Sequence, residues 1–290
     1  MLRKLLATAA AALGAVGLGA GTAGALAFAP FSDPADAQAQ SVVRLLIPYD
    51  DGMAECTGTA VAPQWVLTAQ HCVDGAVLGG TVTTGQGADT RMFRINAWET
   101  APAGDMALIH VTEDMGLSRY PEIAADRVPA GSTAQAYGWS SQGQGITGKL
   151  PTAPVEIVEY GSEDTYGAQD VYMTRTTLPT VLQQGDSGSP IFQDGRVVGV
   201  LSMGISYSPV VPPTMTGLYV HVQTAPLHDW AQGVLRTNPA APAPELPAAP
   251  ELPEFPLPLP NSSDIAGIFG SVDIDSLLPE GVPVPSGSLS

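Results

Sequence analysis

The chain has 290 residues, of which 44% are hydrophobic and 13% are charged. Its 11 Lys and Arg residues against 28 Asp and Glu residues give a formal net charge of −17, and such a surface repels phosphate, which disfavours nucleic acid and anionic lipid as partners. The 32 glycines and 27 prolines, with only 6% aromatic residues, indicate a turn-rich all-β protein with a proline-rich appendage.

The N-terminal segment has the pattern of an export signal. Arg3 and Lys4 are followed by an uncharged stretch over residues 5–26, and the Ala-Leu-Ala triplet at 25–27 fits a small-x-small cleavage site. We therefore expect residues 1–27 to be a signal peptide, cut after Ala27, and the mature protein to be secreted, either free or associated with the cell wall. The Ala-Asp-Ala triplet at 35–37 is a second candidate cleavage site, which Asp36 disfavours, and an uncleaved N-terminal anchor is the alternative to removal. No later apolar run is long enough to span a membrane, so no span is expected after signal removal.

Ten candidate strands occupy the centre of the chain. Each is apolar or β-branched, and Gly, Pro, Asp or Asn residues punctuate the gaps. They cover residues 42–47, 59–68, 92–98, 106–111, 134–139, 154–160, 171–176, 190–192, 196–202 and 217–222. Short strands without long intervening helices predict barrels or a sandwich rather than a parallel α/β sheet. One helix is expected over residues 224–235, where Leu227, Trp230 and Val234 recur at helical spacing.

The composition changes sharply after Asn238, so the folded domain is expected over residues 28–238. Residues 239–260 repeat Ala, Pro, Glu and Leu, and because proline fixes φ and removes backbone donors, this stretch should be an extended linker. Residues 261–290 are acidic and poor in core-forming side chains, which predicts a disordered tail. An autoinhibitory or anchoring role is the alternative for this tail, and its partner is unknown.

Cys56 and Cys72 are the only cysteines and lie sixteen positions apart. In the oxidising compartment that export implies, such a pair predicts a disulfide. The metal-site alternative is weak, because two thiols and the adjacent His71 do not complete a zinc site. No other cluster suggests a metal or a cofactor, and none is expected.

His71 follows a strand, a turn at Pro63 and a second strand. If Cys56 and Cys72 are bonded, the backbone at His71 is pinned. A general base needs such rigidity, because its hydrogen bonds must be held to within fractions of an ångström.

Asp105 directly precedes a wholly apolar strand, so its carboxylate should be partly buried and should need a partner. An imidazole is the natural one, because the carboxylate fixes its tautomer and stabilises the imidazolium. Asp74, Asp114 and Asp126 compete for this role, but Asp74 lies in a turn and Asp114 in a polar loop, where solvation is expected.

Ser187 stands in the segment Gly-Asp-Ser-Gly at 185–188. Serine is a poor nucleophile without an adjacent base. The flanking glycines allow unusual φ and ψ values and a close approach of substrate. The N–H groups of Gly185 and Ser187 could converge on one oxygen and form the anion pocket that acyl transfer requires.

These three blocks resemble the signature segments of the chymotrypsin/trypsin-like serine peptidases of the secreted bacterial type, in the same order of His, Asp and Ser. They read Thr-Ala-Gln-His-Cys at 68–72, Asp-Met-Ala-Leu-Ile at 105–109 and Gly-Asp-Ser-Gly at 185–188. The resemblance extends over about residues 42–235, and it implies two six-stranded antiparallel Greek-key barrels followed by a C-terminal helix.

The resemblance also implies roles for individual residues. His71 would be the general base and then acid, Asp105 would orient it, and Ser187 would attack the scissile carbonyl. The amides of Gly185 and Ser187 would form the oxyanion hole. In many members of the family a newly formed amino terminus pairs with the acid before the serine, here Asp186. Phe28 is the candidate for that terminus.

A specificity pocket follows from the same resemblance. Val181, six positions before the candidate nucleophile, would form the floor, and Gly204 and Gly217 would form the walls. The strand that contains Ser202 would pair with the substrate backbone. An apolar floor predicts an uncharged, apolar side chain before the cut. Leu201, which stands where glutamate-specific relatives carry histidine, argues against an acidic one.

The leading hypothesis is therefore a secreted serine endopeptidase that cleaves protein or peptide substrates through an acyl-enzyme intermediate. The alternative is a catalytically silent relative that binds peptides or partner proteins.

Overall fold

The computed structural model describes residues 26, 29–77, 79–140, 148–207 and 217–237. They belong to the first of two compact units, Met1–Pro244, whereas the second unit, Glu245–Ser290, lies outside the described residues. The predicted linker and tail and all of the predicted signal peptide except Leu26 also lie outside them.

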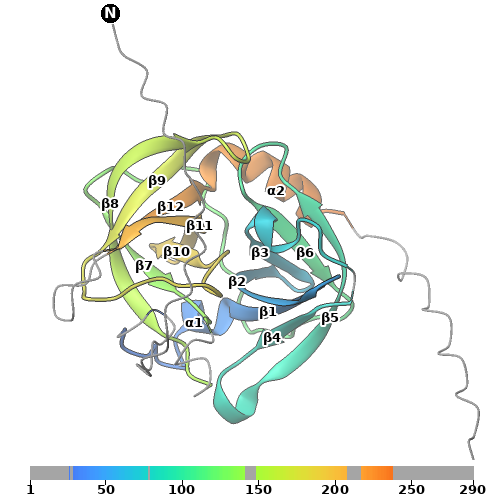
Figure 1. Ribbon diagram of the computed structural model, residues 1–290. Helices are drawn as coiled ribbons and strands as arrows, with labels where there is room; N and C mark the ends of the chain where they lie inside the picture. Colours follow the sequence, from blue (N-terminus) through green and yellow to red (C-terminus); the bar gives the residue numbers. More distant parts are fainter. Residues whose placement is uncertain (1–25, 27–28, 78, 141–147, 208–216, 238–290) are drawn as a thin grey trace, which may run out of the picture. The chain divides into compact units, whose positions relative to one another are not determined.

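Within the described residues, twelve strands form two closed antiparallel barrels (Figure 1). The first barrel has the strand order β1-β2-β3-β6-β5-β4 and closes through pairing of β4 with β1. Its strands are β1 (Val42–Tyr49), β2 (Gly52–Ala62), β3 (Trp65–Thr68), β4 (Thr81–Thr84), β5 (Arg91–Thr100) and β6 (Ala107–Val111).

The second barrel repeats this plan with the order β10-β11-β12-β9-β8-β7, and β7 pairs with β10 to close it. Its strands are β7 (Thr133–Tyr137), β8 (Thr152–Glu163), β9 (Ala168–Thr176), β10 (Pro190–Gln193), β11 (Arg196–Tyr207) and β12 (Gly217–Gln223). Pairing of non-consecutive strands in both barrels, such as β3 with β6 and β9 with β12, gives the predicted Greek-key connectivity. The expected fold class is confirmed.

The segment over 59–68 contains the predicted turn, at Pro63 and Gln64, which separates β2 from β3. One strand is missing from the sequence-based expectation. β4 was not predicted, because Thr81–Thr84 contains a single apolar residue, Val82, and is too short to show an alternation.

Helices are short and lie outside the barrels. α1 (Ala37–Ser41) precedes β1 and is capped by Asp36, whose side chain accepts a hydrogen bond from the backbone N–H of Gln38. The expected C-terminal helix is present, but it begins as a 3₁₀ turn, η4 (Ala225–Leu227), and continues as α2 (His228–Leu235). Among the described residues, no helix combines the length and the hydropathy needed to cross a membrane.

The barrels are joined by buried polar contacts as well as by apolar packing. The indole N–H of Trp139 donates to the carbonyl of Val42 at 3.1 Å. Thr57 on β2 links both barrels, because its Oγ1 accepts from the N–H of Trp139 at 2.9 Å and donates to the carbonyl of Gly185 at 2.9 Å. The side chain of Thr57 therefore fixes the segment before Ser187 against the first barrel.

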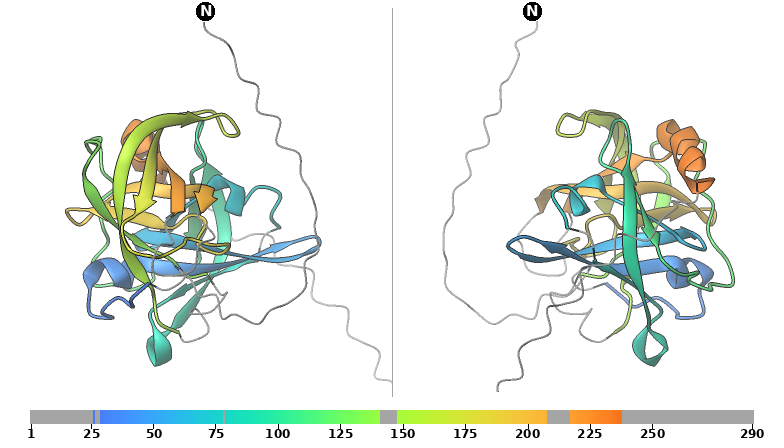
Figure 2. Two further views of the ribbon diagram at one scale, coloured as in Figure 1. Left: turned by 60° about the vertical axis from the view of Figure 1, so that its left-hand side comes forward. Right: turned by 90° about the vertical axis from the view of Figure 1, so that its right-hand side faces the viewer.

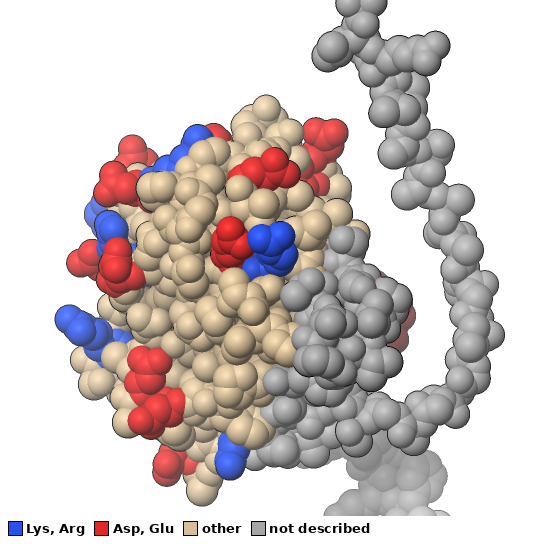
Figure 3. All heavy atoms as spheres, turned by 90° about the vertical axis from the view of Figure 1, so that its left-hand side faces the viewer, with Lys and Arg blue, Asp and Glu red and all other residues tan. Residues whose placement is uncertain are grey.

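The charges on the second barrel are mixed in sign. Figure 3 shows acidic and basic side chains next to one another on the face that it presents. Ion pairs of this barrel among the described residues include Arg127 with Asp170, Arg175 with Glu156 and Arg196 with Asp126, and their side chains are well exposed. Exposed pairs of this kind contribute little to stability.

Candidate active site

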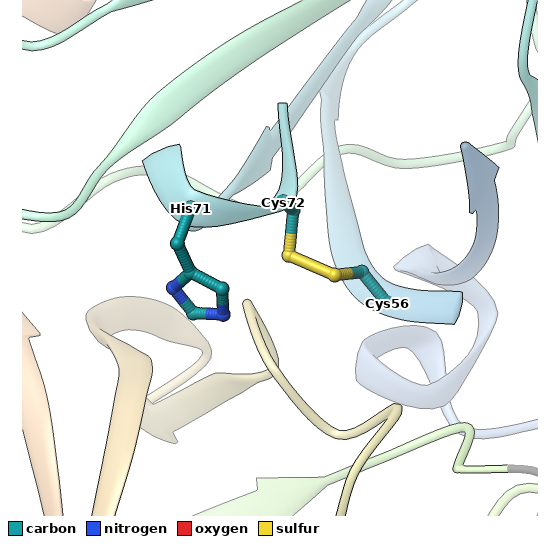
Figure 4. A group of neighbouring side chains, drawn as sticks. All are labelled: Cys56, His71 and Cys72. Atoms are coloured by element: carbon teal, nitrogen blue, oxygen red, sulfur yellow. A yellow bond between two sulfur atoms is a disulfide. The ribbon is translucent and has the colours of Figure 1, made fainter. Parts of the chain in front are cut away.

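His71 lies at the end of the first barrel, where β3 gives way to the 3₁₀ turn η1 (Gln70–Cys72). A disulfide joins Cys72 to Cys56 on β2, as predicted (Figure 4). The hydroxyl of Tyr49 donates to the carbonyl of Cys72 at 2.8 Å. The turn that carries the imidazole is thus held by two contacts, and Figure 4 shows the His71 ring beside the disulfide bond.

Asp105 is the carboxylate that meets this imidazole. Its Oδ2 lies 2.6 Å from Nδ1 of His71, and its Oδ1 accepts the backbone N–H of His71 at 2.8 Å. Asp105 is 1% exposed, and the hydroxyl of Ser202 on β11 donates to the same Oδ2 at 2.7 Å. Because Asp105 contacts Nδ1, the other ring nitrogen of His71, Nε2, is the one that can exchange a proton with a further group.

The competing acids lie elsewhere. Asp114 accepts from Tyr120 and from the N–H of Gly116 on the surface. Asp126 is exposed beside Arg196. Asp74 contacts the hydroxyl of Tyr166 rather than the imidazole.

Ser187 lies in a tight turn that is packed directly against the His71 segment. The carbonyl of Ser187 accepts the N–H of Thr57 at 2.8 Å. Gly188 has φ +79°, and a Cβ added there would lie 2.1 Å from Oγ1 of Thr68 and 2.9 Å from the backbone nitrogen of Ala69. Only glycine permits this approach, which brings the Ser187 turn against Thr68 and Ala69, at the end of β3 and just before the η1 turn that carries His71.

The backbone amides of the Ser187 turn fall into two groups. The N–H groups of Asp186, Gly188 and Ser189 donate to backbone carbonyls of this region. Those of Gly185 and Ser187 donate to no partner among the described residues. Gly185 has φ +97°, a value that favours glycine. Two free amides beside a candidate nucleophile can bind an oxyanion.

Asp186 points away from solvent and is fully buried. Its carboxylate accepts the N–H groups of Gln183 at 2.8 Å, Ser140 at 3.0 Å and Leu26 at 3.3 Å. A Cβ at Gly138 would lie 2.1 Å from Oδ1 of Asp186, so a glycine is needed there. Burial raises the pKa of Asp186 to about 6, although the three amides lower it. Phe28 lies outside the described residues.

The predicted specificity residues are grouped in the second barrel. Val181 is buried, and the hydroxyl of Tyr219 accepts the N–H of Leu182 next to it at 2.9 Å. A Cβ at Gly217 would lie 1.8 Å from that hydroxyl. Gly204 lies opposite Tyr219 in the pairing of β11 with β12.

One group of side chains in the described region has metal-ligand composition. Cys56, His71 and Cys72 have ligand atoms within 4.8 Å of one another. The two sulfur atoms are bonded to each other, so they are not thiolates and cannot act as metal ligands in this state.

Sequence reasoning missed several contacts that support the site. It placed Ser202 on a substrate-binding strand and did not foresee that its hydroxyl contacts Asp105. It also missed Tyr49 and Thr57 as supports of the His71 and Ser187 segments. Each of these contacts joins residues far apart in the chain, and the sequence carries no signal for them.

Comparison with known proteins agrees with this geometry. A sequence model of the trypsin family matches residues 34–231. Two peptidases of Corynebacterium glutamicum are 30% identical over 187 and 186 residues, covering 63% of this chain and 64% of each relative. The chain thus spans less than two thirds of the length of these relatives. Trypsin epsilon of Drosophila erecta is 29% identical over 204 residues, covering 62% of this chain and 78% of that protein.

Solved structures share the fold at low sequence identity. An inactivated protease paralogue of the scabies mite has a TM-score of 0.59 at 16% identity, covering 72% of this chain and 99% of its own. Mouse neuropsin, a serine protease, has a TM-score of 0.57 at 18% identity with the same coverage. With two antiparallel barrels, an Asp105–His71 pair at their junction and the family match over most of the folded region, the chain belongs to the trypsin family.

Proposed function

We propose that the protein is a secreted serine endopeptidase in which Ser187 is the nucleophile, His71 the general base and Asp105 the residue that orients it. The observation that carries this proposal is the 2.6 Å contact of Asp105 with Nδ1 of His71, beside a turn that brings Ser187 against the His71 segment. Family membership supports it independently.

The chemistry follows from this arrangement. Nε2 of His71 accepts the hydroxyl proton as Oγ of Ser187 bonds to the scissile carbonyl carbon, and the amides of Gly185 and Ser187 stabilise the oxyanion. His71 then gives its proton to the leaving amine, which leaves an acyl-enzyme at Ser187. A water molecule, deprotonated by His71, attacks the acyl carbon, and the proton returns to Oγ as the acid product leaves.

The substrate side chain before the cut is proposed to be uncharged and apolar. Val181 as the floor of the pocket offers no charge to a basic or acidic side chain. Gly204 and Gly217 as walls leave room for a medium or large group. The strand that carries Ser202 would bind the substrate backbone by main-chain hydrogen bonds.

Export is also part of the proposal, with an N-terminal signal, a folded domain that ends near residue 238, a linker over 239–260 and a solvated tail over 261–290. The position of Leu26 favours a cut two residues earlier than the triplet at 25–27 suggests. Leu26 is fully buried, and its N–H lies 3.3 Å from Asp186. Ala-Gly-Ala at 23–25 is a second small-x-small triplet.

Hydrolysis of the Ala25–Leu26 bond would convert that N–H into an ammonium group and give the buried carboxylate of Asp186 a cation. A cut after Ala27 would instead remove Leu26 from the buried apolar cluster that it forms with Leu182, Tyr219 and their neighbours. N-terminal sequencing of the secreted protein decides: we expect it to begin at Leu26, and a start at Phe28 would contradict the revised boundary.

The experiment that tests the activity is hydrolysis of a peptide library by the mature protein and by its Ser187→Ala and His71→Ala variants. We expect cleavage after apolar residues, with kcat/KM reduced by about 10⁴-fold or more in both variants. Equal activity of wild type and Ser187→Ala would refute the proposal. Peptide binding without any cleavage by wild type would favour the silent-binder alternative.

A further inference from the structure

The turn between β8 and β9 links the second barrel to the first. The two strands extend upward and bend over the end of their barrel (Figure 1), and their turn projects beyond the other strands in Figure 2. Tyr166, in this turn, accepts the N–H of Gly104 through its carbonyl oxygen at 2.6 Å. Its hydroxyl donates to Oδ2 of Asp74 at 3.3 Å. One residue of the second barrel thus contacts two separate loops of the first.

These two loops carry the candidate catalytic pair. Gly104 directly precedes Asp105 and has φ +88°, a conformation that favours glycine. A hydrogen bond at the N–H of Gly104 therefore restrains the backbone that orients the Asp105 carboxylate. Asp74 follows His71 by three residues, and its N–H donates to the carbonyl of Gln70 at 3.0 Å. Tyr166 therefore contacts the backbone next to Asp105 and the side chain of Asp74 near His71, on either side of the 2.6 Å contact between Asp105 and His71.

The turn holds Tyr166 in place from its own side. The buried carboxylate of Glu163 accepts the N–H groups of Thr165 and Tyr166, the second at 3.1 Å. Gly167 follows with φ +70°, a conformation that favours glycine and completes the turn. Because its backbone is fixed in this way, Tyr166 can transmit the position of the hairpin to the loops that it contacts.

We propose that Tyr166 is a positioning residue that holds the His71 loop and the Asp105 loop at the separation their hydrogen bond requires. The proposal rests on the function proposed for that pair. Tyr166 acts through the two loops and touches no reacting atom.

Acidic side chains surround the Tyr166 hydroxyl, and a neutral hydrogen-bond donor is compatible with them. Burial, with the negative charges of Asp105 and Asp74, raises the pKa of Tyr166 to about 12. The hydroxyl therefore stays protonated and donates to Asp74 throughout the working range of a secreted protein. A carboxylate at this position would repel Asp74, Asp105 and Glu163.

The kinetic test uses two variants of Tyr166. Tyr166→Phe removes the bond to Asp74 but keeps the ring and the carbonyl contact, and we expect kcat to fall about fivefold with KM unchanged. Tyr166→Ala also removes the ring, and we expect a larger fall. Wild-type kcat in both variants would overturn the proposal, and so would a change confined to KM, because that would indicate substrate contact instead.

Tyr160→Phe is the matched control. Tyr160 lies on β8 of the same hairpin, and its hydroxyl bonds to the backbone of Val128 and Ala130, away from His71. We expect this control to lose as much thermal stability as Tyr166→Phe while kcat stays at the wild-type value. An equal loss of kcat in both would overturn the proposal, because the effect would then be general to the hairpin.

A second readout does not depend on activity. The Nδ1 proton of His71, hydrogen-bonded to Asp105, should give a downfield proton resonance in the NMR spectrum of the mature protein at low pH. We expect Tyr166→Ala to shift or broaden it and Tyr160→Phe to leave it unchanged. If wild type has no peptidase activity, the proposed function fails, but a resonance unchanged in Tyr166→Ala would separately refute the role of Tyr166.

Discussion

The hydroxyl of Ser202 and Nδ1 of His71 share one acceptor, Oδ2 of Asp105, at 2.7 Å and 2.6 Å. Ser202 comes from β11 of the second barrel, whereas His71 and Asp105 belong to the first. The second barrel, which also carries Ser187, thus supplies a hydrogen bond to the Asp105–His71 pair. At 1% exposure the carboxyl group of Asp105 has hydrogen-bond partners on both of its oxygens, so this buried polar group is satisfied.

Replacing Ser202 by alanine should weaken catalysis without weakening substrate binding. The change removes a hydrogen bond to a buried charged group but leaves the backbone of β11 intact. We expect kcat to fall about tenfold, with KM within about twofold of wild type. Steady-state kinetics on a peptide substrate measure both. Ser41→Ala is the control, because the Ser41 hydroxyl donates to the carbonyl of Gln38 in α1, away from the site. A rise in KM alone would place Ser202 on the substrate side only.

Asp186 should make the uncut chain less stable as pH rises. Burial raises its pKa from 3.8 to about 6, so the native state holds a proton that the unfolded state has lost between these values. The protonated carboxyl therefore contributes about 3 kcal/mol to the free energy of unfolding below about pH 4. This contribution is lost as pH rises through 6. His221 contributes with the opposite sign over the same pH range, so the Asp186 contribution is the difference between an uncut precursor and its Asp186→Asn variant in chemical denaturation from pH 4 to 7.

Asp186→Asn should remove this contribution, and cleavage that frees Leu26 should remove it too, because the ammonium would stabilise the charged carboxylate. An uncut precursor and a cut protein with identical pH dependence would speak against pairing of Leu26 with Asp186.

His221 should limit stability in acid. Its ring is fully buried, Nδ1 contacts the hydroxyl of Thr174 at 3.0 Å, and Nε2 has no partner among the described residues. Burial lowers its pKa to about 3, so folding excludes a proton that the unfolded chain binds below its ordinary pKa of 6.5. The stability that depends on the neutral ring is present above 6.5 and is lost as pH falls toward 3. We expect His221→Leu to move the acid-unfolding midpoint to lower pH, as followed by circular dichroism. A midpoint unchanged or higher would contradict this.

Removing the disulfide should cost both stability and activity. In the chain-entropy model a cross-link of sixteen residues contributes about 3 kcal/mol. We expect Cys56→Ala with Cys72→Ala to lower the free energy of unfolding in urea by about this amount. Peptidase activity should fall at temperatures well below the midpoint, because His71 adjoins Cys72. Full activity with lower stability would show that the disulfide does not position His71.

The sequence predicted the parts of this molecule that have local signals. His71 follows a strand and adjoins a cysteine, and Asp105 precedes an apolar strand, so each position has a recognisable context. The disulfide was predicted from the expected export together with an isolated pair of cysteines. The order of the three blocks then implied the barrels, and the strand pairing confirmed them.

Features that depend on contacts between residues far apart in the chain were not predicted from the sequence. β4 has only Val82 as an apolar residue and exists because β1 and β5 pair with it on either side. The bond from Ser202 to Asp105 requires β11 to lie across the barrel junction, which no spacing rule predicts. The burial of Leu26 was not predicted, because its segment has the pattern of an export signal and not that of a core strand.

The central claim is that Ser187 is activated by His71. The most direct measurement is the mass of the mature protein after treatment with a fluorophosphonate, followed by peptide mapping. We predict one phosphonyl adduct per chain, located at Ser187, and none in Ser187→Ala or in His71→Ala over the same time. Absence of the adduct in wild type, or labelling that persists in Ser187→Ala, would contradict the account.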